Sequence, residues 1–351
     1  MFSITRWLSS WPLWPLLLRW PSGLLSLIRN ATLPSFHFLK WESSKEQDVE
    51  NSASVSTETE KDLAINPQDT SPLGDIEQNI IVSKGELIAG GSTGLIELMP
   101  SGYVAKSPWT GREAALCRRE LTLESQIYEI LGPHPRLVKI ISWDPTECVL
   151  VMEYMPNGCL KDYLLAHNDI STTQRLRWAQ EAAEGLQLLH SKEVVHCDLG
   201  PKNFLLDADL SLKIADFSGS SLKGSRTQAC ASSRFLTPAF DYRVPQTPPT
   251  VQYDLYALGS TIYNIMTNKA PYEEMESKEV RKLYESREFP DVSGTLCGEI
   301  IQRCWHCEFE SAQEVYDLIR GVEVEQSCKF GFLKLWNVFE CHSLLGFRAS
   351  L

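Results

Sequence analysis

The chain has little positive charge and no repeated cysteine spacing. Its 351 residues include 33 lysines and arginines against 45 aspartates and glutamates, for a formal net charge of -12. Nucleic-acid binders gain affinity from basic patches that neutralise phosphates, so this balance argues against a nucleic-acid partner. Ten scattered cysteines fit a reduced intracellular protein better than a disulfide framework. The closest pair, Cys304 and Cys307, has no second pair to complete a zinc site.

The apolar N-terminal segment, residues 1–41, lacks the features of a spanning helix. Its stretch from Trp7 to Ile28 is long enough to cross a bilayer, but prolines and the central Arg19 interrupt it. No small-residue cleavage site of a secretory signal follows. Tryptophan and leucine mixed with arginine suit a membrane surface, so we expect a cytoplasmic protein with a candidate peripheral membrane anchor here. The alternatives are a disordered segment or a misassigned start site.

Three further segments follow. Residues 42–77 are acidic and rich in serine and threonine, which predicts a disordered linker. Residues 78–322 form one span of domain size, without internal repeats. Residues 323–351 form an apolar tail, for which we expect either an extra helix on the domain or a contact with a partner.

The most informative stretch spaces polar residues as H-x-D-x-x-x-x-N, with His196, Asp198 and Asn203, and places Asp216 after a short apolar strand. Phosphoryl transfer needs a carboxylate that orients and deprotonates the attacking hydroxyl, and oxygen ligands that hold magnesium on nucleotide phosphates. Asp198 fits the first role, and Asn203 with Asp216 fits the second. Lys202 would add a useful positive charge beside Asp198. The arrangement resembles the catalytic core of eukaryotic protein kinases.

A glycine-rich hairpin lies upstream in the order that the resemblance requires. Residues 88–96 read as strand, turn and strand, and a strand with the sequence Val-Ala-Lys follows. In the family such a hairpin covers the ATP phosphates, and the lysine of the next strand contacts them. The resemblance therefore gives nucleotide-binding roles to Gly90, Gly91, Gly94, Ile96 and Lys106. Ala89 stands where the family's first loop glycine usually does, which predicts weaker nucleotide binding.

The lysine needs a carboxylate partner on the helix that follows. Thr110 and Glu113 are spaced as a capping box, which predicts a helix start there. By resemblance Glu124 is the partner of Lys106, because it precedes an apolar pair as the family's glutamate does. Glu120, one turn earlier, is the competing candidate, and either glutamate could instead lie on a solvated face.

Residues 149–158 resemble the strand and hinge between the two lobes of the family's fold. The resemblance makes Met152 the gatekeeper and turns the backbones of Glu153 and Met155 toward the adenine edge. The simpler alternative is a buried edge strand that ends in a Pro-Asn-Gly turn.

Two later elements agree with the resemblance. An amphipathic helix is predicted from Thr172 to His190, leading into the catalytic loop. Asp254 resembles the family's aspartate that steadies the backbone of that loop, although it could be an ordinary charge in the first turn of a helix.

The chain also departs from the family. Cys197 replaces the arginine that commonly clamps a phosphate on the activation loop, so we expect activity that does not require phosphorylation there. Ser218 stands where Asp-Phe-Gly has its glycine. The Ala-Pro-Glu sequence has degenerated within residues 236–240, and its arginine partner is missing from residues 310–312, so we expect an atypical substrate-docking surface.

The resemblance implies an α+β, two-lobed protein kinase-like fold, with a small β-rich N-lobe and a larger helical C-lobe. It implies an ATP- and Mg2+-dependent protein kinase that transfers the γ-phosphate to a protein hydroxyl. Pro201 looks typical of serine/threonine kinases, whereas Lys202 occupies a position that is basic in tyrosine kinases; we favour serine or threonine as the acceptor.

Two other functions stay open. One is a pseudokinase, a nucleotide-binding or scaffolding module, which the changes at Ala89, Cys197 and Ser218 support. The other is a small-molecule kinase, which shares the H-x-D-x-x-x-x-N pattern. The Val-Ala-Lys strand and the hinge both argue against it.

Overall fold

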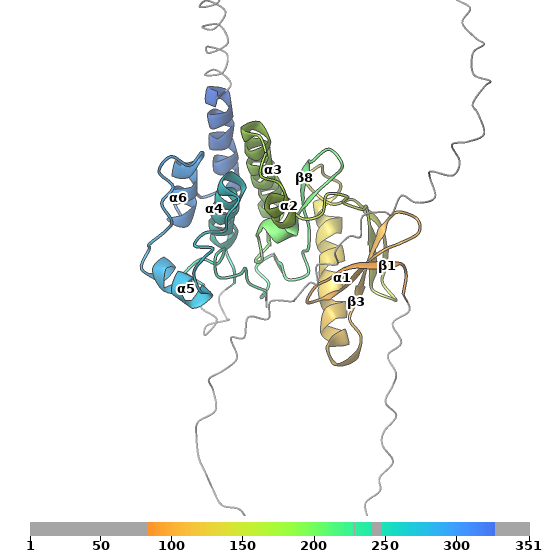
Figure 1. The fold of residues 1–351 in the computed structure, drawn as a ribbon. Helices are drawn as coiled ribbons and strands as arrows, with labels where there is room; N and C mark the ends of the chain where they lie inside the picture. The colour runs from red at the N-terminus through yellow and green to blue at the C-terminus, as the bar shows by residue number, and fades with distance from the viewer. Residues whose placement is uncertain (1–82, 228, 241–247, 327–351) are drawn as a thin grey trace, which may run out of the picture. The chain divides into compact units, whose positions relative to one another are not determined.

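The structure is a computed structural model, and it describes residues 83–227, 229–240 and 248–326 (Figure 1). The expected anchor (1–41), the acidic linker (42–77), the first residues of the expected domain (78–82) and tail residues 327–351 lie outside the described residues. Within them, we find no helix that is both long enough and apolar enough to span a bilayer.

The N-lobe is a five-stranded antiparallel sheet with one helix packed on it (Figure 1). Its strands follow the order β1-β2-β3-β5-β4, and they are β1 (Glu86–Gly90), β2 (Gly94–Leu98), β3 (Val104–Pro108), β4 (Ile140–Asp144) and β5 (Val149–Met152). Helix α1 (Ala114–Leu131) contacts β3 and β5. Its buried side chains recur every three or four residues, as expected for one face of a helix, and they include Leu121, Glu124 and Ile127.

The start of α1 differs from the sequence prediction. A short 3-10 turn, η1 (Gly111–Glu113), follows Thr110, and α1 begins at Ala114. Neither Thr110 nor Glu113 makes a side-chain capping hydrogen bond, so the predicted capping box is wrong. The turn moves the start of the helix past Thr110, whose hydroxyl then no longer meets the N–H groups of the first helical turn.

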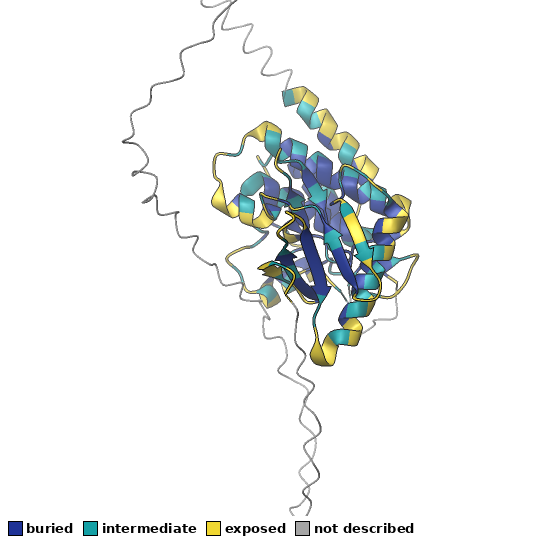
Figure 2. Cartoon of the chain, turned by 90° about the vertical axis from the view of Figure 1, so that its right-hand side faces the viewer, coloured by how far each residue is buried: buried dark blue, intermediate teal, exposed yellow. Residues whose placement is uncertain are grey.

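The C-lobe is mainly helical. Its elements are α2 (Leu160–Ala166), α3 (Thr172–Ser191), β6 (Val194–Val195), η2 (Pro201–Asn203), β7 (Phe204–Leu206), β8 (Leu212–Ile214), β9 (Ser221–Leu222), α4 (Val251–Thr267), α5 (Ser277–Glu285), α6 (Gly298–Trp305) and a last helix over residues 312–326. Helix α4 packs against both α3 and α6, and all three contribute buried side chains to the core. Figure 2 shows the buried residues in dark blue in the interior of the domain. The predicted α+β fold with a β-rich N-lobe and a larger helical C-lobe is confirmed.

The helix predicted from Thr172 to His190 is also confirmed, because α3 ends one residue later. The Ser171 hydroxyl caps it by accepting a hydrogen bond from the N–H of Gln174 at 3.2 Å. The first tail residues, 323–326, continue the last helix. Because α3 leads directly into β6 and contacts it, the end of α3 fixes where the catalytic loop begins.

Candidate active site

Lys106 joins the two lobes through two carboxylates. Its Nζ lies 2.6 Å from Oε2 of Glu124 on α1 and 2.7 Å from Oδ1 of Asp216, which follows β8. The Lys106 and Glu124 side chains are almost fully buried, whereas 44% of the Asp216 side chain is exposed. One ammonium therefore serves two carboxylates, which leaves an excess negative charge at the open side of the site.

The mutual contacts fix the charge states of this triad. Burial acts to lower the pKa of Lys106, but the charges of Asp216 and Glu124 outweigh it and raise that pKa. Burial acts to raise the pKa of Asp216, yet the Lys106 ammonium and hydrogen bonds from Lys106 and Ser218 hold it well below its usual range. Burial raises the pKa of Glu124, although Lys106 opposes this. Lys106 is thus cationic and Asp216 anionic at neutral pH.

Glu120, the competing candidate, does not contact Lys106 as Glu124 does. Glu120 sits one turn before Glu124 on α1 and is only half-buried. No salt bridge joins Glu120 to Lys106 in the part of the chain that the structure describes. The structure therefore brings Lys106 together with Glu124 rather than with Glu120.

Asp254 on α4 holds the start of the catalytic loop. Its buried carboxylate accepts hydrogen bonds from the backbone N–H groups of His196, at 2.7 Å, and Cys197, at 3.0 Å. Nε2 of His190 on α3 lies 3.0 Å from the same carboxylate. The sequence pointed to Asp254 only by resemblance, and the structure places it under the loop as a backbone support.

Asp198 presents its carboxylate beside Lys202. Oδ2 of Asp198 lies 2.8 Å from Nζ of Lys202, and the backbone carbonyl of Asp198 accepts from Nδ2 of Asn203 at 2.7 Å. Oδ1 is buried and has no hydrogen-bond partner among the described residues. Burial raises the pKa of Asp198, and the Lys202 ammonium opposes that rise. The Asp198 carboxylate thus keeps the capacity to accept one further hydrogen bond, such as that of a hydroxyl.

Asn203 is tied to the segment that carries Asp216. The N–H of Ala215 donates to the Asn203 carbonyl at 3.0 Å, and the Ala215 carbonyl lies 3.1 Å from Nε2 of His196. The N–H of Asp198 donates to Nδ1 of His196, which puts the imidazole proton on Nε2, so that Nε2 donates to Ala215. These bonds hold the amide of Asn203 and the carboxylate of Asp216 at the ends of β7 and β8.

The donor set fits magnesium shared with a nucleotide. Within the described residues, no three histidine, cysteine, aspartate or glutamate side chains converge to hold a metal ion without help. Mg2+ typically takes one or two protein carboxylates and completes its shell with phosphate oxygens and water. The anionic Asp216 and the amide oxygen of Asn203 match such a partial site.

The glycines of the turn between β1 and β2 differ in how much space surrounds them. A Cβ built on Gly94 would overlap the carbonyl oxygen of Ser107 on β3, so Gly94 is needed for the sheet itself. A Cβ on Gly91 would meet nothing within 4 Å. Ile96 lies opposite Lys106 in the β2–β3 register. Gly91 therefore lies on the open side of the turn, where a ligand can approach its backbone.

Trp109, just after β3, holds this turn in place. Its Nε1 donates to the Gly91 carbonyl at 2.8 Å, and its ring lies 3.4 Å from where a Cβ on Gly90 would be. Sequence reasoning missed Trp109. A single tryptophan after a strand gives no signal of a contact that is made 18 residues earlier.

The hinge residues occupy the predicted strand end. Met152 is buried at the end of β5. The N–H of Glu153 already donates to the Lys139 carbonyl at 2.9 Å, so only its carbonyl can serve an adenine edge. Its side chain accepts from Nζ of Lys213 at 2.5 Å, a contact that ties the hinge to β8 and that the sequence did not reveal. The Met155 carbonyl accepts from the N–H of Gly158.

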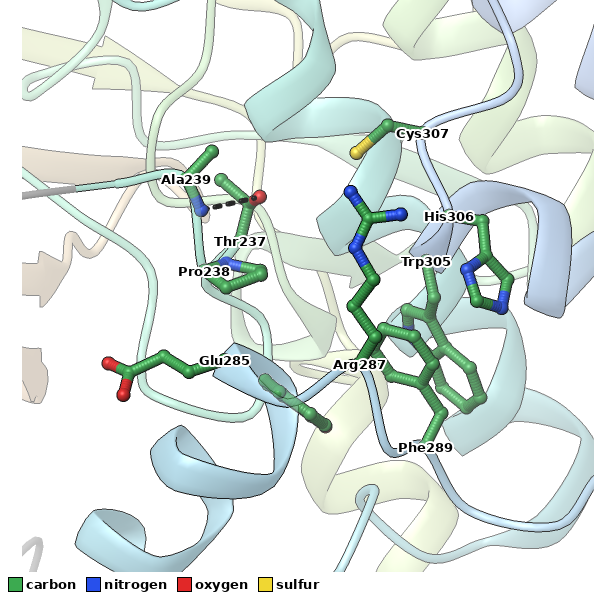
Figure 3. A pocket seen from close by; sticks show the side chains of 10 residues that line it. Thr237, Pro238, Ala239, Glu285, Arg287, Phe289, Trp305, His306 and Cys307 are labelled. Atoms are coloured by element: carbon green, nitrogen blue, oxygen red, sulfur yellow. Dashed lines mark hydrogen bonds between the residues drawn. The ribbon is translucent and has the colours of Figure 1, made fainter.

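The degenerate Ala-Pro-Glu region lines a pocket beside the ends of α5 and α6 (Figure 3). Ala239 lies within the degenerate stretch, and its N–H donates to the Thr237 hydroxyl. Arg287 points from the end of α5 toward Cys307 after α6. The degenerate stretch and the segment after α5 thus line the same pocket.

Comparisons with known proteins agree with this geometry. A family model described as "Protein kinase domain" matches residues 103–325, which begins after the glycine turn. The Arabidopsis thaliana protein named "Probable serine/threonine-protein kinase PBL28" is 30% identical over 240 residues, covering 59% of this chain and 64% of that protein. The Mus musculus protein named "Cytoplasmic tyrosine-protein kinase BMX" is 27% identical over 246 residues, covering 63% of this chain and 37% of that protein. The chain thus spans less than two thirds of either relative's length.

Proposed function

This chain belongs to the protein kinase domain family, and from that premise we propose that it transfers the γ-phosphate of ATP to a protein hydroxyl. The observation that carries the proposal is the contact of Lys106 with both Glu124 and Asp216. In phosphoryl transfer the lysine–glutamate pair and the metal-binding aspartate must both be in place. Here one ammonium links them across the two lobes.

The nucleotide site would be built by the N-lobe and the hinge. The backbone of the glycine turn would approach the phosphates, Lys106 would bind them, and Glu124 would orient Lys106. Met152 and the backbones next to it would border the adenine. Together the proposed nucleotide-binding residues are Gly90, Gly91, Gly94, Ile96, Lys106, Glu124, Met152, Glu153 and Met155. Ala89, in place of the family's first loop glycine, favours modest affinity.

The catalytic residues would be Asp198 and Lys202. The Asp198 carboxylate accepts the proton of the substrate hydroxyl, while the hydroxyl oxygen attacks the γ-phosphorus and ADP leaves. Lys202, held at 2.8 Å from Asp198, offsets the negative charge of the transferred group. Mg2+, when bound with ATP, supplies further neutralisation of phosphate charge. Asn203 and Asp216 would be its protein ligands.

We propose that this transfer does not depend on phosphorylation of the activation segment. Cys197 is buried where the resemblance expects a phosphate-binding arginine. The segment start is instead held by hydroxyl groups, because Ser220 donates to the His196 carbonyl at 3.3 Å and Thr227 donates to the Gly219 carbonyl. Strands β6 and β9 pair beside these bonds. Neutral contacts of this kind need no phosphate to form.

Serine or threonine is the acceptor that we favour. Pro201 and the relative named as a serine/threonine-protein kinase support this choice. The position of Lys202 and the relative named as a tyrosine-protein kinase instead support tyrosine as the acceptor. Incubation of the chain with Mg-ATP and matched serine, threonine and tyrosine peptide libraries, followed by phosphosite mapping, tests it. Phosphotyrosine alone would overturn the preference.

We also propose how the chain divides into segments. We propose a catalytic domain over residues 78–322, a linker over 42–77 and a tail over 323–351. We propose a cytoplasmic protein whose segment 1–41 contacts a membrane surface, with a protein substrate and no nucleic-acid partner. Flotation of the chain with and without residues 1–41 on anionic vesicles tests the membrane contact, which equal flotation would contradict.

A further inference from the structure

Ser218 makes a contact that the glycine of Asp-Phe-Gly cannot make. Its side chain is buried, and its hydroxyl donates a hydrogen bond to Oδ1 of Asp216 at 2.9 Å. The intervening Phe217 is fully buried, with its ring centroid 4.9 Å from that of Tyr128 on α1. The two residues that follow Asp216 are therefore both held in place, Phe217 by packing and Ser218 by its hydrogen bond.

The hydrogen bond from Ser218 leaves one carboxylate oxygen available. Lys106 also donates to Oδ1 of Asp216, at 2.7 Å. Both donors thus meet the same oxygen, and Oδ2 takes no hydrogen bond from any residue that the structure describes. Because 44% of the Asp216 side chain is exposed and both donors already meet Oδ1, Oδ2 is the oxygen left for an incoming cation.

The backbone at Asp216 needs such support. Asp216 has a φ of 67°, in the left-handed region that non-glycine residues rarely adopt. Such a conformation persists only when its surroundings hold it. A hydroxyl two residues away that bonds to the side chain of the strained residue is a direct way to hold it. The bond is also charge-assisted, since its acceptor is ionised.

We propose that Ser218 is a positioning residue, whose hydroxyl fixes Asp216 with Oδ1 turned to Lys106 and Oδ2 turned outward to receive Mg2+. The inference rests on the proposed function, since it concerns the metal ligand of that same site. It differs from the simple reading in which Ser218 is a tolerated replacement of glycine. In that reading, removing the hydroxyl would alter folding stability alone.

The test is the Mg2+ dependence of nucleotide binding by the full chain. The probe is a non-hydrolysable ATP analogue titrated by calorimetry at a series of Mg2+ concentrations. For Ser218→Ala we expect the Mg2+ concentration at half-maximal binding to rise about tenfold, as for loss of a hydrogen bond to a charged group. Without Mg2+, the affinity of the two proteins should agree within about twofold. Ser218→Thr, which keeps the hydroxyl, should restore the Mg2+ dependence.

Ser220→Ala is the matched control. Ser220 is fully buried, and its hydroxyl donates to a backbone carbonyl rather than to Asp216. It should lower the melting temperature without moving the Mg2+ midpoint. If Ser218→Ala changes only the melting temperature, as Ser220→Ala does, the inference is overturned. If Ser218→Ala fails to fold, Ser218→Gly, the residue that the family carries, replaces it under the same criterion.

The outcomes separate this inference from the proposed function. Mg2+-dependent binding by the unaltered chain with no shift in Ser218→Ala overturns the role of Ser218 alone. A shift in Ser218→Ala without any phosphate transfer upholds that role and overturns catalysis. Nucleotide binding that ignores Mg2+ in the unaltered chain overturns both.

Discussion

Nζ of Lys106 in the sheet lies 2.7 Å from Oδ1 of Asp216 in the helical lobe, 110 residues later in the chain. Glu124 binds the same ammonium from the other side at 2.6 Å. This triad brings a strand, a helix and the start of the activation segment to one point.

Replacing Glu124 by glutamine should lower phosphate transfer at least about tenfold, because the buried Lys106 then loses its charged partner on α1. The matched control is Glu120→Gln, one turn earlier on the same helix, which should stay within about twofold of the unaltered chain. Initial rates at saturating Mg-ATP measure both. Equal losses in the two variants would contradict the pairing.

The Gly91 and Gly94 positions should respond differently to alanine. Gly94→Ala should lower the melting temperature, because its Cβ would overlap the Ser107 carbonyl, and overpacking of this kind costs about 1–3 kcal/mol. Gly91→Ala should melt normally, since its Cβ has open space, but should weaken nucleotide binding. Thermal unfolding and nucleotide titration distinguish them. A normal melting temperature for Gly94→Ala would show that the sheet tolerates a side chain there.

Asp254→Asn should destabilise the protein and abolish transfer. An amide keeps one oxygen but turns its NH2 toward the backbone N–H groups of His196 or Cys197, which leaves a buried donor unpaired at about 1–3 kcal/mol. For a domain of this size the melting temperature should fall by several degrees, about 2–4 °C per kcal/mol. Asp169→Asn, at an exposed position between α2 and α3, is the control and should melt as the unaltered chain does. Full activity of Asp254→Asn would contradict its support of the loop.

Lys202 should influence the pH at which the phosphate-transfer rate falls on acidification, the acid limb of the pH–rate profile. Asp198 must be ionised to accept a proton, and burial raises its pKa, so the rate should fall on acidification at a higher pH than an ordinary aspartate would give. Lys202→Met removes a cation that opposes this rise, so the acid limb should move to still higher pH. Lys278→Met, exposed on α5, should leave the limb in place. Superimposable profiles of Lys202→Met and the unaltered chain would rule out this coupling.

Phosphatase treatment should leave the transfer rate unchanged, because hydroxyl hydrogen bonds rather than a phosphate hold the start of the activation segment. The rate is measured before and after treatment, with mass spectrometry to verify removal of phosphate. Loss of activity on treatment would contradict the proposal that transfer, with Cys197 in place of the phosphate-binding arginine, does not depend on phosphorylation of the activation segment.

The family resemblance, which rests on motifs and their spacing, predicted the fold and supplied the proposed roles of the candidate site residues. Asp198 and Asn203 share one loop, and Lys106 lies on a strand directly after a glycine turn, so local order sufficed to propose their roles. Contacts between distant segments were not readable, such as Trp109 with Gly91 or Lys213 with Glu153. They depend on how the lobes and strands pack, for which a single sequence carries no periodic signal.

The capping box at Thr110 and Glu113 is a local motif that the sequence predicted and the structure does not form. A motif that fits by spacing failed because η1 intervenes before α1 begins. Short polar motifs depend on backbone dihedral angles that neighbouring residues impose, and Gly111 at a φ of 85° turns the chain there. Ser218 is a similar case, since the sequence showed the exchange for glycine but not the hydrogen bond to Asp216 that accompanies it.

The most direct measurement is transfer of labelled γ-phosphate from Mg-ATP to protein by the full chain, beside the variants Asp198→Asn and Asp209→Asn. Asp198 holds the free acceptor oxygen at the centre of the site, whereas Asp209 is exposed in the turn between β7 and β8. The proposal predicts transfer by the unaltered chain and by Asp209→Asn, with loss in Asp198→Asn. Equal transfer by all three, or none by the unaltered chain despite bound Mg-ATP, would contradict it.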